Sequence, residues 1–381
     1  MHPRRTAITS TTAALAALAA LTTPATASAP APAAGNMPSY APDISNTGRY
    51  VVFASDATNL TPGDTNNKRD IFIRDTLNKT TRIVSKPKTG QANGASYDPS
   101  VSDDGRYVAF VSDASNLVPG DTNTTRDAYR ADLATGAITR VSVTGAGAQG
   151  NGPTYRVSLS ASGKVVLFDS SATNLVPGDT NTTEDTFRRD LTTTTVTRLT
   201  GATATSAAWR RDSSLSPNGN IAAWLADGDA WQWNKSTGKT TRVFARWEDT
   251  ESAMDAIAVR ASNAGASYVT EYWGGGYVEG TSVASPATMT MTWGSNTPAG
   301  GKAWDVSTWG AMTAAYNTWT NPDTLSAFAA NVNEVLSVRG DVTDLAISGD
   351  GSTIAYTDQA YPAQVRMWNW RNKTVIIASV S

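Results

Sequence analysis

The sequence predicts an all-β fold that is built from a repeated unit of short strands. Strand-like runs of four to six residues, rich in Val, Ile, Tyr, Phe and Thr, are separated by clusters of Asp, Asn, Gly and Pro. The pattern recurs at a nearly constant interval, since the turn residues Gly48, Gly105 and Gly163 lie 57 and 58 residues apart. The chain has no Cys, so disulfides cannot contribute to its stability.

The repeat is clearest between residues 102 and 142. There a Ser-x-x-Gly turn is followed by an apolar run, a polar loop and two more strand-like runs. Residues 45–85 and 160–199 show the same order. A further strand-like stretch precedes each turn, at 39–44, 96–101 and 154–159. Each unit is therefore expected to contain four strands.

Weaker copies of the unit follow, with turns that end at Gly219, Gly265 and Gly351. The last two glycines are 86 residues apart, which fits either two short units or one unit with an insertion. A linear array of such sheets would leave strand edges exposed, whereas radial closure protects them. The sequence thus predicts a β-propeller of six or seven four-stranded blades over residues 37–381.

The motif Tyr-x-Pro-x-x-Ser-x-x-Gly-Arg-Tyr-Val-x-Phe, followed by an Asp-x-Phe strand and Thr-Thr-Arg-x-x-Ser, resembles the TolB-type β-propeller repeat. The resemblance is clear over 37–245, fair over 342–381 and poor in the irregular blades at 250–340. It implies a propeller outside the cytoplasm that serves as a rigid binding platform. TolB's own role is not implied, because we expect no TolB-type N-terminal α/β domain ahead of the propeller.

The first residues have the features of a secretory signal peptide over 1–29. Arg4 and Arg5 give a basic start, 13–21 is apolar, and small residues follow. The apolar run is shorter than the roughly 20 residues that span a bilayer, which favours secretion over anchoring or membrane insertion. A disordered Ala/Thr tail is the alternative, and the export route stays open. Residues 30–36 are expected to form a flexible lead-in.

Without the signal peptide, 29 basic residues face 33 acidic ones, a formal charge of −4. This balance gives no electrostatic basis for binding nucleic acid or an anionic membrane. About 350 remaining residues are enough for one large core, so we expect one domain and a monomer.

A loop with the pattern Asp-x-Asn-x-x-x-Asp occurs in the first three units and is the most specific candidate site. Its side-chain oxygens are hard ligands of the kind that Ca²⁺ prefers, so the loops predict structural Ca²⁺ sites. Position 6 is not Gly, which argues against an EF-hand. The alternative is that Asp and Asn form Asx-turns without metal. The candidate ligands are Asp64, Asn66, Asp70, Asp121, Asn123, Asp127, Asp179, Asn181 and Asp185. The later acids Asp75, Asp132 and Asp190 are predicted to be turn residues.

Aromatic residues supply a second set of candidates. Tyr40, Tyr97 and Tyr155 occupy equivalent places in the predicted innermost strands, where they either bind a ligand or cap the strand entry. All 12 Trp follow residue 200. Most Trp are expected to pack between blades, and Trp273 and Trp309 are the candidates for exposed ligand-binding rings.

No catalytic residue is predicted. Residues 280–286 resemble the nucleophile segment of subtilisin-type proteases, with Ser282 as the nucleophile, but that mechanism needs a His base. The only histidine is His2, inside the predicted signal peptide. The sequence therefore predicts a secreted, non-enzymatic propeller that binds a protein or cell-envelope partner, stabilised by Ca²⁺. The alternative is a carbohydrate-binding or carbohydrate-active propeller that uses the Trp-rich second half.

Overall fold

The computed structural model describes residues 33–200, 212–248 and 252–380, with short internal gaps. The gaps are 275–276, 285–290, 295–303, 307–312, 318–323, 330–331, 339–341 and 359–361. Between 252 and 343 the description is of the backbone alone, apart from residues 259–266, 268, 336, 338 and 342. The predicted signal peptide lies outside the described residues.

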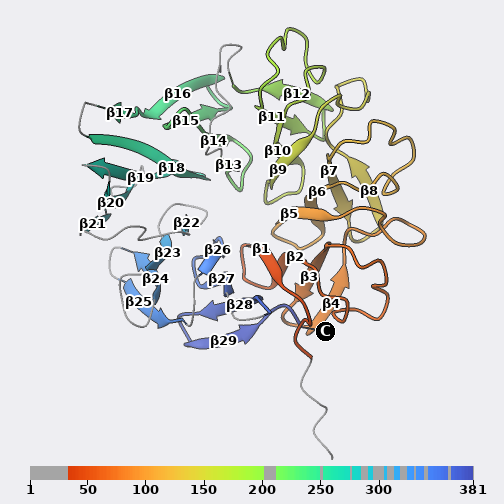
Figure 1. Cartoon of the computed structure of the whole chain (residues 1–381), viewed down its shortest axis with the longest axis horizontal. Helices are drawn as coiled ribbons and strands as arrows, with labels where there is room; N and C mark the ends of the chain where they lie inside the picture. The colour runs from red at the N-terminus through yellow and green to blue at the C-terminus, as the bar shows by residue number, and fades with distance from the viewer. Residues whose placement is uncertain are drawn as a thin grey trace, which may run out of the picture. The chain divides into compact units, whose positions relative to one another are not determined.

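The described chain forms seven antiparallel sheets, here called blades 1 to 7, each made of strands that are consecutive in sequence (Figure 1). Blade 1 contains β1 (Ser39–Ile44), β2 (Tyr50–Ser55), β3 (Asp70–Asp75) and β4 (Thr80–Ile83). Blade 2 contains β5 (Ser96–Val101), β6 (Tyr107–Ser112), β7 (Asp127–Asp132) and β8 (Ala137–Arg140). Blade 3 contains β9 (Thr154–Leu159), β10 (Val165–Ser170), β11 (Asp185–Asp190) and β12 (Thr195–Arg198).

The remaining blades follow the same order. Blade 4 contains β13 (Ser213–Leu215), β14 (Ile221–Ala226), β15 (Asp229–Asn234) and β16 (Lys239–Phe244). Blade 5 has five strands, β17 (Trp247–Glu248), β18 (Ser252–Ser262), β19 (Gly265–Gly274), β20 (Tyr277–Ala284) and β21 (Met291–Gly294). Blade 6 contains β22 (Trp304–Val306), β23 (Thr313–Asn317), β24 (Thr324–Ala329) and β25 (Val332–Ser337). Blade 7 contains β26 (Val342–Ile347), β27 (Thr353–Asp358), β28 (Gln364–Asn369) and β29 (Thr374–Ile377).

The predicted all-β propeller is thus confirmed, and the number of blades among the described residues is seven. The 86-residue interval between Gly265 and Gly351 corresponds to two units, because the whole of blade 6 lies between these turns. Ser282 lies within strand β20, as its Ser/Thr/Val surroundings predict.

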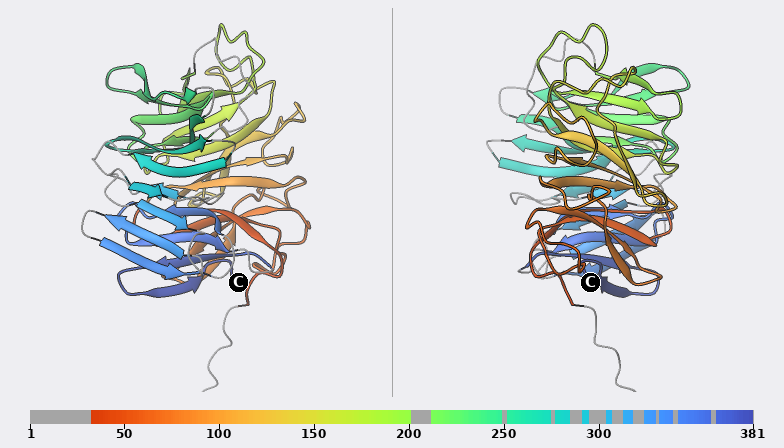
Figure 2. Two further views of the ribbon diagram at one scale, coloured as in Figure 1. Left: turned by 60° about the vertical axis from the view of Figure 1, so that its left-hand side comes forward. Right: turned by 90° about the vertical axis from the view of Figure 1, so that its right-hand side faces the viewer.

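The blades form a closed ring (Figure 1), seen from the side in Figure 2, and each blade packs on the next through its innermost strand. Blade 7 meets blade 1 through contacts of β1 with β26 and β27. The closure is reinforced by an antiparallel bridge between Ala34 and Val380 and by a hydrogen bond from the Gly35 N–H to the Ser379 carbonyl, 3.0 Å long. No blade exchanges a strand with another, so edge contacts of this kind close the ring.

The core lies between neighbouring blades. The second and third strands of a blade are covered on both faces, so their sequences are nearly continuous apolar runs. In β2, for example, residues Val51 to Ala54 are all buried. Stacked aromatic pairs link these two strands in each of the first three blades, with ring centroids 5.5 to 5.9 Å apart. The pairs are Phe53 with Phe72, Phe110 with Tyr129, and Phe168 with Phe187.

The tryptophans whose side chains are described pack in this core. Trp224 and Trp368 are each 3 % exposed. Trp231 and Trp233 both pack against the cluster between blades 3 and 4, and Trp370 packs beside Trp368. For the Trp residues whose side chains are described, these contacts confirm the expectation that Trp packs between blades.

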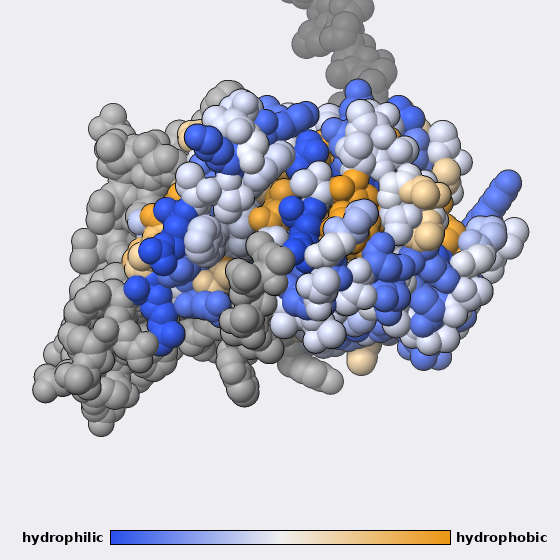
Figure 3. All heavy atoms as spheres, turned by 90° about the horizontal axis from the view of Figure 1, so that it is seen from above, coloured by the Kyte–Doolittle hydropathy of each residue, from blue (hydrophilic) through white to orange (hydrophobic). Residues whose placement is uncertain are grey.

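Hydrophilic residues cover most of the described surface on the side of the ring shown in Figure 3, and apolar side chains show only in small separate groups. The large hydrophobic residues that are exposed are Met37, Leu77, Tyr155, Val375 and Ile376. Within the described part of the chain there is no helix that could cross a membrane.

Candidate functional site

Each of the first three blades brings two aspartates together beneath the loop between its second and third strands. One aspartate comes from the loop and the other is the first residue of the third strand. The pairs are Asp64 with Asp70, Asp121 with Asp127, and Asp179 with Asp185. The strand aspartates are fully buried, and Asp64 is 6 % exposed. In each pair the charge of the loop aspartate raises the pKa of the strand aspartate, although burial is the larger cause.

Local chemistry explains how the loop holds this geometry. In blade 1, Pro62 and Gly63 occupy the centre of a turn in which the Asp64 N–H donates to the Thr61 carbonyl at 3.3 Å. The strand aspartate is fixed by a hydroxyl from the end of the blade: Ser85, Ser142 and Thr200 donate to Asp70, Asp127 and Asp185 respectively.

The asparagines of the loops form Asx-turns. The Asn66 side-chain oxygen accepts the Lys68 N–H at 2.9 Å, and Asn123 and Asn181 accept the N–H of Thr125 and Thr183 in the same way. The Asn66 amide nitrogen donates to Asp70 at 2.9 Å. The structure therefore places the asparagine oxygens on the loop backbone and the amide group toward the aspartate.

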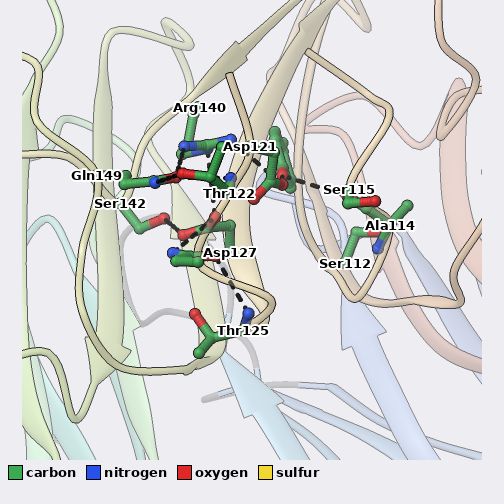
Figure 4. A network of polar contacts seen from close by, with 12 residues as sticks. Ser112, Ala114, Ser115, Asp121, Thr122, Thr125, Asp127, Arg140, Ser142 and Gln149 are labelled. Atoms are coloured by element: carbon green, nitrogen blue, oxygen red, sulfur yellow. Dashed lines mark hydrogen bonds and ion pairs between the residues drawn. The ribbon is translucent and has the colours of Figure 1, made fainter. Parts of the chain in front are cut away.

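An arginine lies beside the aspartate pair in blade 2 and supplies a counter-charge to it (Figure 4). The Arg140 guanidinium lies 3.2 Å from both Asp121 and Asp127, and it donates to the Gln149 side-chain oxygen at 2.5 Å. Arg140, with an 8 % exposed side chain, is itself buried. The Tyr129 hydroxyl also donates to Asp121, at 2.7 Å. Asp121 and Asp127 thus share a buried counter-charge that comes from the last strand of their own blade.

Blade 3 repeats the arrangement and blade 1 does not. Arg198 lies 2.6 Å from Asp179 and 3.6 Å from Asp185. The strand registers place Arg140 opposite Tyr129, Arg198 opposite Phe187, and Ile83 opposite Phe72. Blade 1 therefore carries isoleucine where the other two blades carry arginine.

Sequence reasoning did not single out Arg140 and Arg198. The repeat interval could have revealed them. Steps of 57 and 58 residues align Arg140 and Arg198 with Ile83 rather than with the neighbouring Arg82. Arg82 is exposed in the structure. The acids Asp75, Asp132 and Asp190 accept backbone N–H groups two residues ahead, which confirms that they are turn residues.

The three equivalent tyrosines and the arginines between them form a row, which we call the Tyr–Arg ladder: Tyr40, Arg69, Tyr97, Arg126 and Tyr155. Tyr155 belongs to it through its electrostatic interaction with Arg126. The Arg69 guanidinium lies 4.2 Å from the Tyr40 ring centre and 5.4 Å from that of Tyr97. Arg126 lies 4.3 Å from the Tyr97 ring centre. These distances are within the range of cation–π contacts.

Two carboxylates hold the arginines of the ladder in place. Asp56 accepts two hydrogen bonds from Arg69, at 2.9 and 2.8 Å, and Asp113 accepts two from Arg126, at 2.9 and 3.2 Å. These hydrogen bonds raise the pKa of both arginines. Burial raises the pKa of Tyr40 and Tyr97. At the end of the ladder 39 % of Tyr155 is exposed.

The structure does not describe the side chains of the two Trp candidates. Trp273 lies on β19, paired with Ala253 and Val278 in the neighbouring strands, and its side chain is outside the described part of the structure. Trp309 lies outside the described residues.

The inner strands bring together a group of charges that sequence reasoning did not select. Asp98 on β5, Arg156 on β9, Asp169 on β10 and Asp212 interact with one another across blades 2 to 4. Arg156 and Asp212 are 3.7 Å apart, and Arg260 pairs with the same Asp212. Burial raises the pKa of Asp98 to about 6. These residues belong to strands far apart in sequence, so no local spacing reveals the group.

In the described part of the chain, no group of three or more His, Cys, Asp or Glu side chains is arranged to hold a metal ion. The loops bring two carboxylates together in each case. The candidate sites are therefore the aspartate pairs of blades 1 to 3 and the Tyr–Arg ladder that runs across the same blades.

The fold defines the chain as a β-propeller protein. No protein-family model matches the chain, and none of the curated proteins matches it. Among solved structures it is similar to one of two prolyl endopeptidases (12 % identity, TM-score 0.57), covering 90 % of this chain and 49 % of that one. It is also similar to the β-propeller domain of the Trilobed protease from Pyrococcus furiosus (11 %, TM-score 0.54), covering 90 % and 97 %.

TolB from Acinetobacter baumannii is a further match, at 14 % identity and a TM-score of 0.47, covering 87 % of this chain and 63 % of that one. This chain thus spans less than two thirds of the TolB and prolyl endopeptidase chains. At these identities the likeness concerns the fold. The β-propeller that the TolB-type resemblance implies is confirmed.

Proposed function

We propose that this chain is an extracytoplasmic, non-enzymatic β-propeller that acts as a binding scaffold for a protein or cell-envelope partner. The observation that carries the proposal is the Tyr–Arg ladder. Tyrosine, arginine and tryptophan are the residue types that contribute most to the binding energy of protein interfaces. The ladder presents them side by side on three successive blades of a rigid fold.

The ladder side chains are also held in place. Arg69 and Arg126 each have a bidentate carboxylate partner and stack on tyrosine rings. Side chains that are already ordered lose less conformational entropy when a partner binds. They remain accessible, since Arg69 and Arg126 expose 28 % and 30 % of their side chains.

The proposal is tested by binding of the purified chain, without residues 1–32, to cell-envelope fractions of the cells that produce it. Replacing Tyr97 and Arg126 by Ala together should weaken saturable binding by at least about tenfold, as expected for interface anchors. Leu77→Ala is the matched control, because Leu77 is 70 % exposed and follows β3, away from the ladder.

Two results would contradict the proposal. Binding that is unchanged in the Tyr97/Arg126 double variant would remove the ladder as the contact surface. Hydrolysis of peptide substrates by the purified chain would contradict a non-enzymatic role. The assay is relevant because the similar structures include a prolyl endopeptidase and the propeller domain of a protease. Specific glycan binding that is lost on Trp273→Ala or Trp309→Ala would instead support the carbohydrate alternative.

A further inference from the structure

Three buried oxygen atoms at the loop of blade 1 have no hydrogen-bond partner in the structure. They are the two carboxylate oxygens of Asp64 and the side-chain oxygen of Gln91. The Gln91 amide nitrogen donates to the Gly63 carbonyl, which holds Gln91 beside the loop. Asp64 is 94 % buried, since 6 % of it is exposed. Burial raises the pKa of this carboxyl. The nearby Asn66 backbone N–H opposes that shift, although it makes no hydrogen bond of normal geometry to Asp64.

Blade 2 shows what the same three positions contact when an internal cation is present. The counterparts of Asp64, Asp70 and Gln91 are Asp121, Asp127 and Gln149. All three of these counterparts face one guanidinium, that of Arg140 (Figure 4). The oxygens of blade 1 are therefore equivalent to a set that surrounds a positive charge.

Blade 1 has lost the two groups that satisfy this set in blade 2. Ile83 replaces Arg140, and Phe72 replaces Tyr129, whose hydroxyl donates to Asp121. Both replacements are hydrocarbon. Ile83 packs against the apolar core of blade 1 instead. Two carboxylates are thus left in a buried place without a cationic side chain among the described residues.

Burying carboxylates without a counter-charge is unfavourable by several kcal/mol per ion, which a proton or a bound cation can relieve. The oxygens available are two carboxylates and one amide carbonyl, all hard ligands. Pro62 and Gly63, which immediately precede Asp64, are exposed, so loop carbonyls and water can complete a coordination shell of six to eight.

We infer that blade 1 binds one calcium ion through Asp64, Asp70 and the side-chain oxygen of Gln91, in the place that the arginine guanidinium occupies in blades 2 and 3. The ion is a structural element that supplies the missing positive charge. Blades 2 and 3 bind none, because the guanidinium groups of Arg140 and Arg198 already occupy the place of the cation beside their aspartate pairs. Of the nine candidate metal ligands in the three loops, this inference keeps Asp64 and Asp70 and adds Gln91.

The test is calcium binding to the full mature chain by titration calorimetry, together with thermal unfolding in millimolar CaCl₂ and in chelator. Wild type should bind one equivalent and unfold a few degrees higher with calcium, since a ligand that binds the native state stabilises it. Asp64→Asn should lose the binding and the calcium-dependent shift.

Ile83→Arg is the decisive variant. It recreates the arrangement of blade 2, so it should bind no calcium and should be at least as stable in chelator as wild type is with calcium. This variant separates loss of the site from failure to fold, because its folding is favoured. The reverse variant, Arg140→Ile combined with Tyr129→Phe, should raise the stoichiometry from one equivalent to two.

The inference is overturned if wild type binds no calcium at millimolar concentration and its unfolding midpoint is the same in calcium and chelator; the carboxyls would then share a proton. It is equally overturned if Ile83→Arg still binds one equivalent. Binding of three equivalents by wild type would show that the arginines of blades 2 and 3 do not exclude the ion.

Discussion

The glycine that ends a Ser-x-x-Gly turn packs against a side chain of the preceding blade. Gly105 has φ +67°, and a Cβ atom on it would lie 2.3 Å from the ring of Tyr50 in the preceding blade. Gly163 has φ +68° and meets Tyr107 in the same way, at 2.2 Å. The repeat keeps Gly here both for its backbone conformation and for the room that the tyrosine requires.

We predict that Gly105→Ala destabilises the protein much more than Gly120→Ala. Gly120 also has a positive φ, +75°, but nothing lies within 4 Å of the added carbon. Gly120→Ala should therefore cost about 1–2 kcal/mol from backbone strain alone. Gly105→Ala should cost about 1–3 kcal/mol more, from overlap with Tyr50. Urea unfolding measures both, and equal losses would show that the tyrosine contact adds nothing.

Position 83 and its equivalents show how one side chain decides the chemistry of a loop. Arg140 and Arg198 lie over their aspartate pairs, and Ile83 leaves the pair of blade 1 without such a partner. The loop sequence Pro-Gly-Asp-Thr-Asn is the same in all three blades. The difference therefore comes from the last strand of each blade rather than from the loop.

The inner strands are joined from blade to blade by side chains that accept backbone N–H groups. Asp43 accepts from Val101 at 2.8 Å, and Asp98 accepts from Val157 at 2.7 Å. Ser100 continues the series by accepting from Leu159, at 3.0 Å. Each bond satisfies a backbone N–H group of the inner strand of the next blade, which is an edge strand of its sheet. These strands thus hold the ring together by polar contacts as well as by the apolar core.

We predict that Asp98 makes stability fall as the pH rises from about 4 to about 6. Burial raises its pKa in the folded state to about 6, from 3.8, against the favourable charge of Arg156. Because the folded state keeps this proton to a higher pH than the unfolded chain does, the stabilisation is complete at low pH and is lost as the pH passes the folded pKa. A shift of about two units corresponds to about 3 kcal/mol.

Asp98→Asn should remove this contribution, because the amide does not titrate and can still accept the Val157 N–H. Asn also tolerates the φ of 49° at this position. Asp169 and Asp212 face the same group, and other buried acids titrate in both proteins. The readout is therefore the difference between wild type and variant in urea unfolding free energy from pH 4 to pH 7. A difference that does not change with pH would refute the assignment.

Closure of the ring depends on a short segment ahead of the first strand. Besides the Ala34 bridge to Val380, the Gln364 side chain donates to the Gly35 carbonyl at 3.2 Å, and the Ser39 N–H donates to the Ala363 carbonyl at 2.8 Å. Asn36 exchanges hydrogen bonds with Thr58, and its backbone N–H donates to the Asn59 side-chain oxygen. The first and last blades are thus fastened at their edges by residues 34–39.

We predict that a chain starting at Ser39 unfolds at a lower temperature than a chain starting at Ala33. The shorter chain loses the bridge and the Gly35 and Asn36 hydrogen bonds, each of which contributes about 0.5–1.5 kcal/mol. Differential scanning calorimetry of the two proteins measures the effect. Equal midpoints would show that the inner-strand and core contacts close the ring without this segment.

Much of the fold could be predicted from the chain because the repeat is local. Each blade is a run of consecutive strands joined by Gly, Asp and Asn turns, so the spacing of Gly48, Gly105 and Gly163 marks its period. The three inner strands at 39–44, 96–101 and 154–159 have the predicted bounds. The number of blades could not be fixed, because the nearly constant interval between turn glycines ends after Gly219, and the 86 residues between Gly265 and Gly351 fit either one unit or two.

The candidate site was predictable in part, for the same physical reason. The aspartates were visible as a motif, because they lie within seven residues of one another in one loop. By itself the sequence determined the propeller, its strand order and the repeated aspartate loops. Only the tertiary structure showed which groups face those aspartates, because Arg140, Arg198 and Gln149 reach them from other strands and linkers. It alone also joined Tyr40, Tyr97 and Tyr155 to the arginines between them, since packing of blade on blade, and not spacing along the chain, sets those contacts.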